Sequence, residues 1–360
     1  MMKNFALVSL GIILTYSSAR CHAESWINDP NGCKAFNPNP VSGESITWDG
    51  ACLNGYISGK GTLTWLDSNH AFSEKQEGFF TQGKLNGLGS FTTREGYHYE
   101  GDFIDNQGNG KGLMITPTGD RYEGDFINNL PTGKDTLTTS SGIRFEGDFV
   151  NGELTGQGVM TTTPTFQLNE KPNNSTSDKT LMTSYRGGFI GTLPFGKGTA
   201  TFSNGAYFEG DFFNGQLSGK GILTAANGSK YTGDFSKSTF NGKGILHLSN
   251  GTHYDGSFVN GKLEGKGTLT LANGDRFAGD FSNDEPNGRG AMTWHNGDSY
   301  IGYMAHGKPN GDGIQTLKNG VQIIGTFLNG RATSDVDVLD PENQPILGVN
   351  KYKFIWITEY

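Results

Sequence analysis

The stretch Tyr254–Arg276, YDGSFVNGKLEGKGTLTLANGDR, begins again at Phe277 as FAGDFSNDEPNGRGAMTWHNGDS and once more at Tyr300. Most of the chain is this one unit of 23 residues, so the repeat decides the fold before any single residue does. The step between units is 23 residues, with two exceptions. The units begin at Trp48, Gln76, Tyr99, Tyr122, Phe145, Tyr185, Phe208, Tyr231, Tyr254, Phe277, Tyr300 and Ile323.

One unit has the pattern of a β-hairpin. Side chains alternate across a strand, so Tyr254, Gly256 and Phe258 share one face of the first strand. After a turn at Asn260–Gly265, the second strand begins at Lys266, and its apolar residues alternate with threonines. The hairpin therefore has one apolar and one polar face. We expect aromatic rings from adjoining strands to lie over the glycines of the apolar face, so that glycine is required there by space.

The series of units predicts the fold class. A lone hairpin is marginal in water, so neighbouring hairpins must stack to bury the aromatic face. Twelve hairpins in series predict an all-β protein, an elongated single antiparallel sheet arranged as a meander. Because a single sheet has no second layer, we expect it to twist and curl into a rod that shelters its rings.

The unit resembles the MORN repeat (membrane occupation and recognition nexus), whose motif is Y-x-G-x-F-x-x-G-x-x-x-G-x-G. The residues that match it in two units are Tyr254, Gly256, Phe258, Gly261, Gly265 and Gly267, and Phe208, Gly210 and Phe212. The resemblance covers about Trp48 to Gly330. It implies hairpin arrays that act as scaffolds, are often dimeric and have a debated capacity for phospholipid binding. Some members carry a kinase or methyltransferase domain, and this chain has no separate domain of that size.

Residues 1–23 are expected to be a signal peptide. The apolar run Phe5–Tyr16 is too short to span a bilayer, and small residues permit cleavage after Ala23 or after Ala19. We therefore expect an exported protein, periplasmic or extracellular. The remaining regions are an N-terminal cap at 24–47, the repeat array at 48–330, and a C-terminal tail with a capping strand at 331–360.

Cys33 and Cys52 are the two cysteines that remain after removal of the signal. An even pair in an exported chain predicts a disulfide. Cys52 stands where later units carry Phe, so the bond would tie the cap to the first unit.

Two regions interrupt or follow the repeat. The polar insertion near residues 163–183 is expected to be a protruding loop, and whether it has a function is left open. After Arg331 the unit is gone. Asp335–Pro345 is acidic and predicted to be loop-like, and Lys351–Thr358 alternates like a final strand that closes the sheet edge.

Charged residues recur at fixed offsets on the polar face. Acids after the first glycine are Asp102, Asp125, Asp148, Asp211, Asp234 and Asp280, and bases before the last glycine are Lys111, Lys197, Lys220, Lys243, Lys266 and Arg289. Successive acids are expected about 10 Å apart, too far to share a cation or to act as an acid–base pair. We therefore predict charge pairing across strands.

Nothing in the pattern predicts catalysis, a cofactor or a metal site. The Gly-x-Gly pairs lack the strand–loop–helix context of a phosphate loop, and the histidines lack metal or triad spacing. The formal charge of -8 argues against nucleic acid as a partner. The sequence thus predicts a non-enzymatic exported scaffold that binds another protein or its own copy.

The alternative is a module that binds a glycan or a phospholipid headgroup on the aromatic face. The residues offered as a ligand or partner face are Trp65, Tyr99, Tyr122, Tyr185, Tyr231, Trp294 and Tyr300. The identity of the ligand or partner is left open.

Overall fold

A computed structural model of the chain describes residues 25–162 and 181–346. The described residues form strands and turns and contain no helix, so they include none long and apolar enough to cross a membrane. They divide into two compact units, with the boundary between Ala200 and Thr201 inside the strand Leu193–Phe202.

The strands of the N-terminal unit are β1 (Ser25–Asn28), β2 (Lys34–Asn37), β3 (Ser45–Trp48), β4 (Ala51–Leu53), β5 (Tyr56–Leu66), β6 (Phe72–Thr81), β7 (Lys84–Thr93), β8 (His98–Ile104), β9 (Gln107–Ile115), β10 (Arg121–Ile127), β11 (Leu130–Thr138), β12 (Ile143–Val150), β13 (Glu153–Thr162), β14 (Met182–Ile190) and β15 (Leu193–Phe202). Those of the C-terminal unit are β16 (Tyr207–Phe213), β17 (Gln216–Thr224), β18 (Lys230–Ser236), β19 (Thr239–His247), β20 (His253–Val259), β21 (Lys262–Thr270), β22 (Arg276–Ser282), β23 (Glu285–Thr293), β24 (Ser299–Ala305), β25 (Lys308–Thr316), β26 (Gln322–Leu328) and β27 (Arg331–Leu339).

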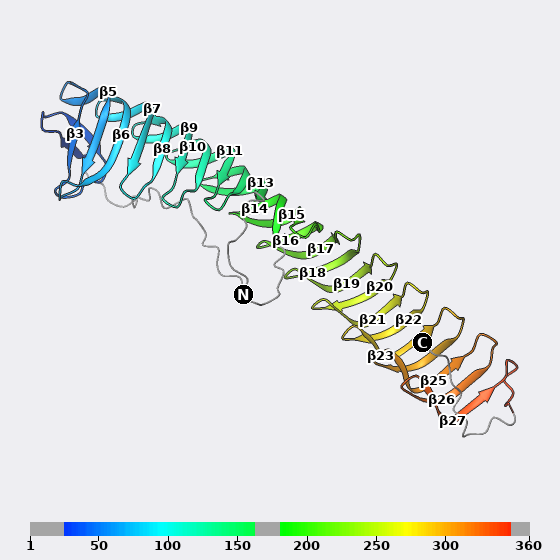
Figure 1. Ribbon diagram of the computed structural model, residues 1–360. Helices are drawn as coiled ribbons and strands as arrows, with labels where there is room; N and C mark the ends of the chain where they lie inside the picture. Colours follow the sequence, from blue (N-terminus) through cyan, green and yellow to red (C-terminus); the bar gives the residue numbers. More distant parts are fainter. Residues whose placement is uncertain (1–24, 163–180, 347–360) are drawn as a thin grey trace. The chain divides into compact units, whose positions relative to one another are not determined.

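Within each unit the strands follow one another as an antiparallel meander (Figure 1). Each strand pairs with the next along the chain from β5 to β14, and again from β16 to β27. At the N-terminal end, β3 and β4 both pair with β5, and β1 pairs with β2. The predicted all-β meander of hairpins is confirmed.

The hairpin turn is shorter than the sequence suggested. Asn260 and Gly261 have φ of 50° and 83°, as a two-residue type I′ turn requires, so β21 starts at Lys262 and not at Lys266. Gly265, with φ of 68°, lies inside β21, where the register with β20 shifts between Gly256 and Phe258. The predicted turn at Asn260–Gly265 is therefore a tight turn followed by a β-bulge, which a left-handed glycine permits.

The apolar face is a buried row of rings over paired glycines. Tyr254 and Phe258 are each 1% exposed, and Gly256 lies opposite Gly267. A Cβ on Gly267 would lie 2.5 Å from ring atoms of Tyr254, so the prediction that glycine is required by space is confirmed. The ring comes from the adjoining strand for Gly267, as expected, but from the same strand for Gly256.

The rings also join each hairpin to the next. Tyr254 meets Phe258 of its own strand at 5.1 Å between ring centroids, and Phe281 of the following hairpin at 5.0 Å, both edge to face. In the N-terminal unit, Tyr99 contacts Phe103 and Phe126 in the same way. Such pairs contribute about 1 kcal/mol each beyond the area they bury. Contact between neighbours thus holds the array together.

The structure changes two predicted boundaries. β14 begins at Met182, so the last part of the predicted loop 163–183 is strand. β27 pairs with β26 as far as Leu339, so Asp335–Leu339 is strand where a loop was predicted. Its valines alternate with aspartates, and the acidic composition obscured that alternation. The signal peptide, residues 163–180 of the loop and the strand predicted at Lys351–Thr358 lie outside the described residues.

Candidate functional site

The aromatic side chains offered as a ligand face are core residues. Exposure is 0–2% for Tyr99, Tyr122, Tyr185, Tyr231 and Tyr300 and 8% for Trp65, whereas Trp294 is half-buried. The rings are covered because neighbouring hairpins pack their own Phe and Tyr rings against them, as the pair of Tyr231 and Phe258 illustrates. This burial agrees with the prediction that stacked hairpins cover the aromatic face, and it leaves the glycan or lipid alternative without a platform among these tyrosines.

The tyrosine hydroxyls have a structural role. Tyr231 Oη donates to the backbone carbonyl oxygen of Asp234 at 2.9 Å, and Tyr300 Oη donates to that of Tyr303 at 3.0 Å. Burial raises the pKa of Tyr231 to about 12, because the apolar surroundings disfavour the phenolate, and the same holds for Tyr300. These groups stay neutral and bonded to backbone.

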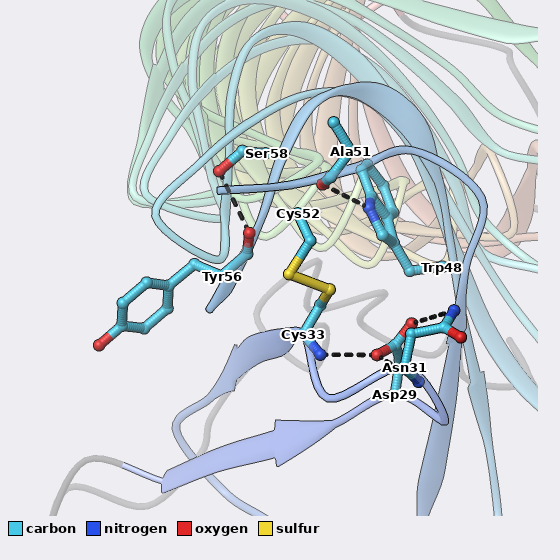
Figure 2. Close-up of a disulfide and its surroundings, with 8 residues drawn as sticks. All are labelled: Asp29, Asn31, Cys33, Trp48, Ala51, Cys52, Tyr56 and Ser58. Carbon is cyan, nitrogen blue, oxygen red and sulfur yellow. Dashed lines mark hydrogen bonds between the residues drawn. A yellow bond between two sulfur atoms is a disulfide. The ribbon is translucent and has the colours of Figure 1, made fainter. Parts of the chain in front are cut away.

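The predicted disulfide between Cys33 and Cys52 is confirmed, with 5.8 Å between the Cα atoms (Figure 2). Asp29 Oδ1 accepts the Cys33 N–H at 2.7 Å, which holds the cap turn in place. Trp48 replaces the motif tyrosine in this first hairpin. Its Nε1 donates to the carbonyl oxygen of Ala51 at 2.9 Å, three residues on, as the tyrosine hydroxyls do. The cap is thus bonded covalently to an otherwise regular hairpin.

The predicted charge pairing across strands is confirmed at three steps of the sheet, whereas Lys134 and Asp148, which also lie opposite each other, form no ion pair within the described residues. Nζ–carboxylate distances are 2.9 Å for Lys111–Asp125, 2.9 Å for Lys220–Asp234 and 2.8 Å for Lys266–Asp280. We call this row the Lys–Asp ladder. The hydrogen bond from Lys220 holds the pKa of Asp234 below its ordinary value. The lysines are largely exposed and the acids partly so, and solvent screens the attraction, so each pair contributes little to stability.

Two of the ladder acids also bond their own hairpins. Asp234 Oδ2 accepts the backbone N–H of Lys243 at 3.1 Å, and Asp280 Oδ2 accepts that of Arg289 at 3.1 Å. The carboxylate therefore supports the bulge of its hairpin while it faces the lysine of the preceding one.

A groove of about 1130 Å³ lies along the polar face of the N-terminal unit. We call it the polar-face groove. It is lined from β5 to β12 by Lys60, Glu77, Gly78, Leu88, Gly89, Ser90, His98, Glu100, Gly101, Lys111, Gly112, Leu113, Arg121, Glu123, Gly124, Asp135, Thr136 and Arg144. The glycines lack side chains, which leaves the space open between two rows of charged residues. A hollow of this size, lined by both charge signs, suits a segment of polypeptide better than a small molecule.

The repeat motif did not reveal two exposed apolar residues of this face. Phe79 stands where other hairpins carry the ladder acid, and Leu88 stands where they carry the ladder base. They are 55% and 76% exposed. Comparing each unit with its neighbours at these offsets would have found both, because the departure is visible in the sequence.

Asp135 is a second departure that the motif did not reveal. It replaces the last motif glycine of its hairpin, and its carboxylate accepts the Asp125 N–H at 2.9 Å. It also lies 4.0 Å from Lys111 Nζ. Burial and the nearby Asp135 raise the pKa of Tyr122. The Asp135 carboxylate is hydrogen-bonded to the backbone of its own hairpin, so we assign it a structural role and not a catalytic or ligand-binding one.

Two histidines, His247 and His253, stack on each other at 5.5 Å between ring centroids, and two others pair with acids. His295 Nδ1 lies 2.9 Å from Asp275 Oδ1, and His306 Nδ1 lies 3.0 Å from Glu285 Oε2. Across residues 25–162 and 181–346, no group of three or more His, Cys, Asp or Glu side chains is arranged to hold a metal ion.

Comparison with solved structures gives distant likenesses. The chain is similar to the TCP10 domain of Danio rerio CPAP, at 13% identity and a TM-score of 0.29, over 66% of this chain and 99% of that one. The E1021V mutant of that domain gives the same identity and score, over 98% of its length. The same domain in complex with a peptide of Danio rerio STIL matches at 12% identity and a TM-score of 0.26, over 77% and 99%. Scores this low carry no argument about function.

No curated protein sequence matches the chain. The family profile described as MORN repeat matches eleven segments, at 53–70, 77–96, 99–121, 122–142, 145–163, 185–207, 208–230, 231–253, 254–276, 277–299 and 300–322. The twelfth predicted unit, from Ile323, is not matched, although β26 and β27 pair as a hairpin there. The matched segments cover most of the chain, and the hairpins, rings and glycines they contain are those described above, so the chain belongs to the MORN-repeat family.

Proposed function

We propose that this protein is a non-enzymatic scaffold whose N-terminal unit binds a segment of another protein in the polar-face groove. The observation that carries the proposal is the groove itself, which is open, crosses several hairpins and is lined by both charge signs. An extended polypeptide presents side chains of both signs along its length. It can therefore pair with such a lining, whereas a uniformly anionic ligand cannot.

The repeat supports this assignment. Its side chains are divided between a buried row of rings and a charged outer face, and both serve the array. Repeat arrays commonly present extended surfaces of this kind to partners.

Export is part of the proposal. The disulfide between Cys33 and Cys52 supports it, because structural disulfides persist in oxidising compartments. The test is the N-terminus of the protein recovered from fractionated cells. We expect it to begin at Glu24, or at Arg20 if cleavage follows Ala19, in the periplasmic or external fraction. A chain that retains Met1 in the cytosol would overturn export.

The binding proposal is tested by site-specific photo-cross-linking. A benzophenone amino acid replaces Ser90 in the groove, and in a matched control it replaces Thr118, which lies in an exposed turn of the same unit. We expect a defined protein adduct from position 90 and none from position 118. Equal yields from both positions, or no protein adduct, would refute binding in the groove. An adduct of twice the chain mass would identify a second copy as the partner.

A further inference from the structure

The Lys–Asp ladder is broken at one hairpin of the polar-face groove. In the register of the sheet, Phe79 lies opposite Lys60 of β5, where the ladder places an acid. On the other side of the same hairpin, Leu88 lies opposite Asp102 of β8, where the ladder places a base. Two apolar residues thus replace two charges, and each replacement removes the partner of a charge on a neighbouring strand.

The broken ladder leaves two charges without their pairs. Neither Lys60 nor Asp102 makes an ion pair with any residue that the structure describes. Asp102 still accepts the Lys111 N–H at 3.2 Å, as Asp234 and Asp280 accept the corresponding N–H in their own hairpins. Where the ladder is regular, the acid lies opposite a lysine of the preceding hairpin. Asp102 lies opposite Leu88 instead.

The change does not serve the hairpin that carries it. Asp234 and Asp280 each accept a backbone N–H of their own hairpin. Phe79 has no acceptor atom in its side chain, so its hairpin lacks this hydrogen bond. Neither apolar side chain is buried in return, because both remain more than half exposed. Two other departures from the ladder keep a contact: Lys243 Nζ bonds Ser257 Oγ at 2.8 Å, and the Arg289 guanidinium lies 4.7 Å from the centroid of the Tyr303 ring.

We infer that Lys60 and Leu88, which line the groove, and Phe79 and Asp102, which lie opposite them in the sheet, form a recognition patch at the groove, and that this patch binds an extended protein segment carrying an acid, apolar residues and a base in that order. This rests on the proposed function of the groove and names the chemistry of its partner. The acid pairs with Lys60, the apolar side chains cover Phe79 and Leu88, and the base pairs with Asp102.

The spacing of the patch sets the spacing of the partner. Lys60 on β5 and Asp102 on β8 are three strand steps apart, which is about 14 Å at 4.8 Å per step. An extended chain advances about 3.4 Å per residue, so its acid and base should be about four positions apart. Apolar residues then fall between them. An extended segment is favoured over a second copy because the patch borders a hollow, and two equally hollow faces would meet only at their rims.

The first test uses fluorescent synthetic peptides and the full chain. The probe is Gly-Ser-Glu-Leu-Thr-Leu-Lys-Ser-Gly, and its controls replace the charged pair by two Glu or by two Lys. Anisotropy should show that the wild-type protein binds the mixed peptide about threefold more tightly than either control, since one exposed ion pair is worth that much. Equal affinity for all three peptides would overturn the assignment.

Charge reversal in the patch gives a result that loss of folding cannot imitate. K60E makes both ends of the patch acidic, so its preferred peptide should become the one with two Lys. D102K makes both ends basic, so its preferred peptide should become the one with two Glu. Unchanged preferences in both variants would refute the inference.

A second variant separates the patch from the groove. F79D combined with L88K restores the residues of the regular ladder, so it should keep or raise the melting temperature. It should weaken binding of the mixed peptide by at least about tenfold, because the apolar contact is lost. If cross-linking from position 90 persists undiminished in this variant, the patch is refuted while the groove function stands. If wild type shows no adduct at all, the proposed function itself fails. A dimer that F79D with L88K dissociates would replace the peptide by a second copy.

Discussion

At the scale of single residues, the fold depends on how closely a ring approaches glycine. A Cβ on Gly112 would lie 2.5 Å from Tyr99 Oη, and Tyr99 is only 2% exposed. We expect Gly112→Ala to lower the free energy of unfolding by about 2–3 kcal/mol, because the strands on both sides prevent relief of the overlap. Urea denaturation measures this loss.

The matched control for that variant is Gly59→Ala. Gly59 has φ of 79° and nothing within 4 Å of the added Cβ, so the substitution costs only backbone strain of about 1 kcal/mol. If Gly112→Ala were no more destabilising than Gly59→Ala, the overlap with the ring would not explain the glycine.

Buried tyrosines make the protein sensitive to alkali. The folded-state pKa of Tyr231 is raised to about 12, against about 10 in an unfolded chain. The stability this group contributes is therefore fully present below about pH 10 and is lost as the pH rises toward 12. We expect unfolding by circular dichroism to coincide with tyrosinate absorbance in that window.

Tyr231→Phe tests the assignment. Phe208 and Phe277 already occupy the same motif position, each below 3% exposed, so the ring without a hydroxyl fits there. The variant should be nearly as stable as wild type at pH 7, where only the bond to the Asp234 carbonyl is lost, and it should lose less stability between pH 10 and 12. An identical alkaline profile would show that the phenol of Tyr231 does not contribute.

At the scale of elements, the cap depends on the disulfide. Cys33 and Cys52 close a segment with a sequence separation of 19 residues, which stabilises by roughly 3 kcal/mol through the entropy of the unfolded chain. Reduction should lower the temperature at which the cap strands unfold, with a change in the fluorescence of Trp48. A variant with Ser at both positions should melt at that lower temperature whether or not reductant is present. Equal melting of oxidised and reduced wild type would contradict this.

The hairpins show what the sequence could predict and what it could not. The period, the shared face of Tyr254 and Phe258 and the pairing of Lys220 with Asp234 follow from local spacing, and all three are found. The bulge at Gly265 was missed because strand and turn residues look alike around a tight Asn-Gly turn. The burial of Tyr99 was expected from the stacking of hairpins, but the sequence did not show that Phe126 of the next hairpin is the ring that packs against it.

The groove could not be predicted from the motif for a related reason. The motif describes only what the hairpins share. Leu88 and Asp135, which line the groove, depart from it. The register of the sheet is needed to show that Phe79 lies opposite Lys60 and Leu88 opposite Asp102, so that two charges lack their usual partners.

At the scale of the whole molecule, the array should tolerate removal of one complete unit. In the C-terminal unit, the Phe208 ring contacts Phe235 at 5.1 Å between centroids. Deletion of residues 231–253 brings Phe258, which holds the same motif position, to that place. We expect a folded protein with the same circular dichroism per residue and a smaller denaturant m-value, because less surface is buried.

A deletion of half a unit is the control. Removing residues 231–241 leaves one strand without its hairpin partner and disrupts the ring row, so cooperative unfolding in that unit should be lost. If both deletions unfolded alike, stacking by whole hairpins would not be the principle that holds the array.

In the ring row, Tyr254 contacts Phe258 of its own hairpin and Phe281 of the following one, so the hairpins are joined neighbour to neighbour. A gene that gains or loses one repeat changes the length by two strand spacings, about 9.6 Å, and leaves every local contact as it was. The distance from the disulfide to Phe79 and Leu88 does not change when later hairpins are added or removed. Within the N-terminal unit, a second docking point on a later hairpin can therefore move relative to them only by multiples of this length.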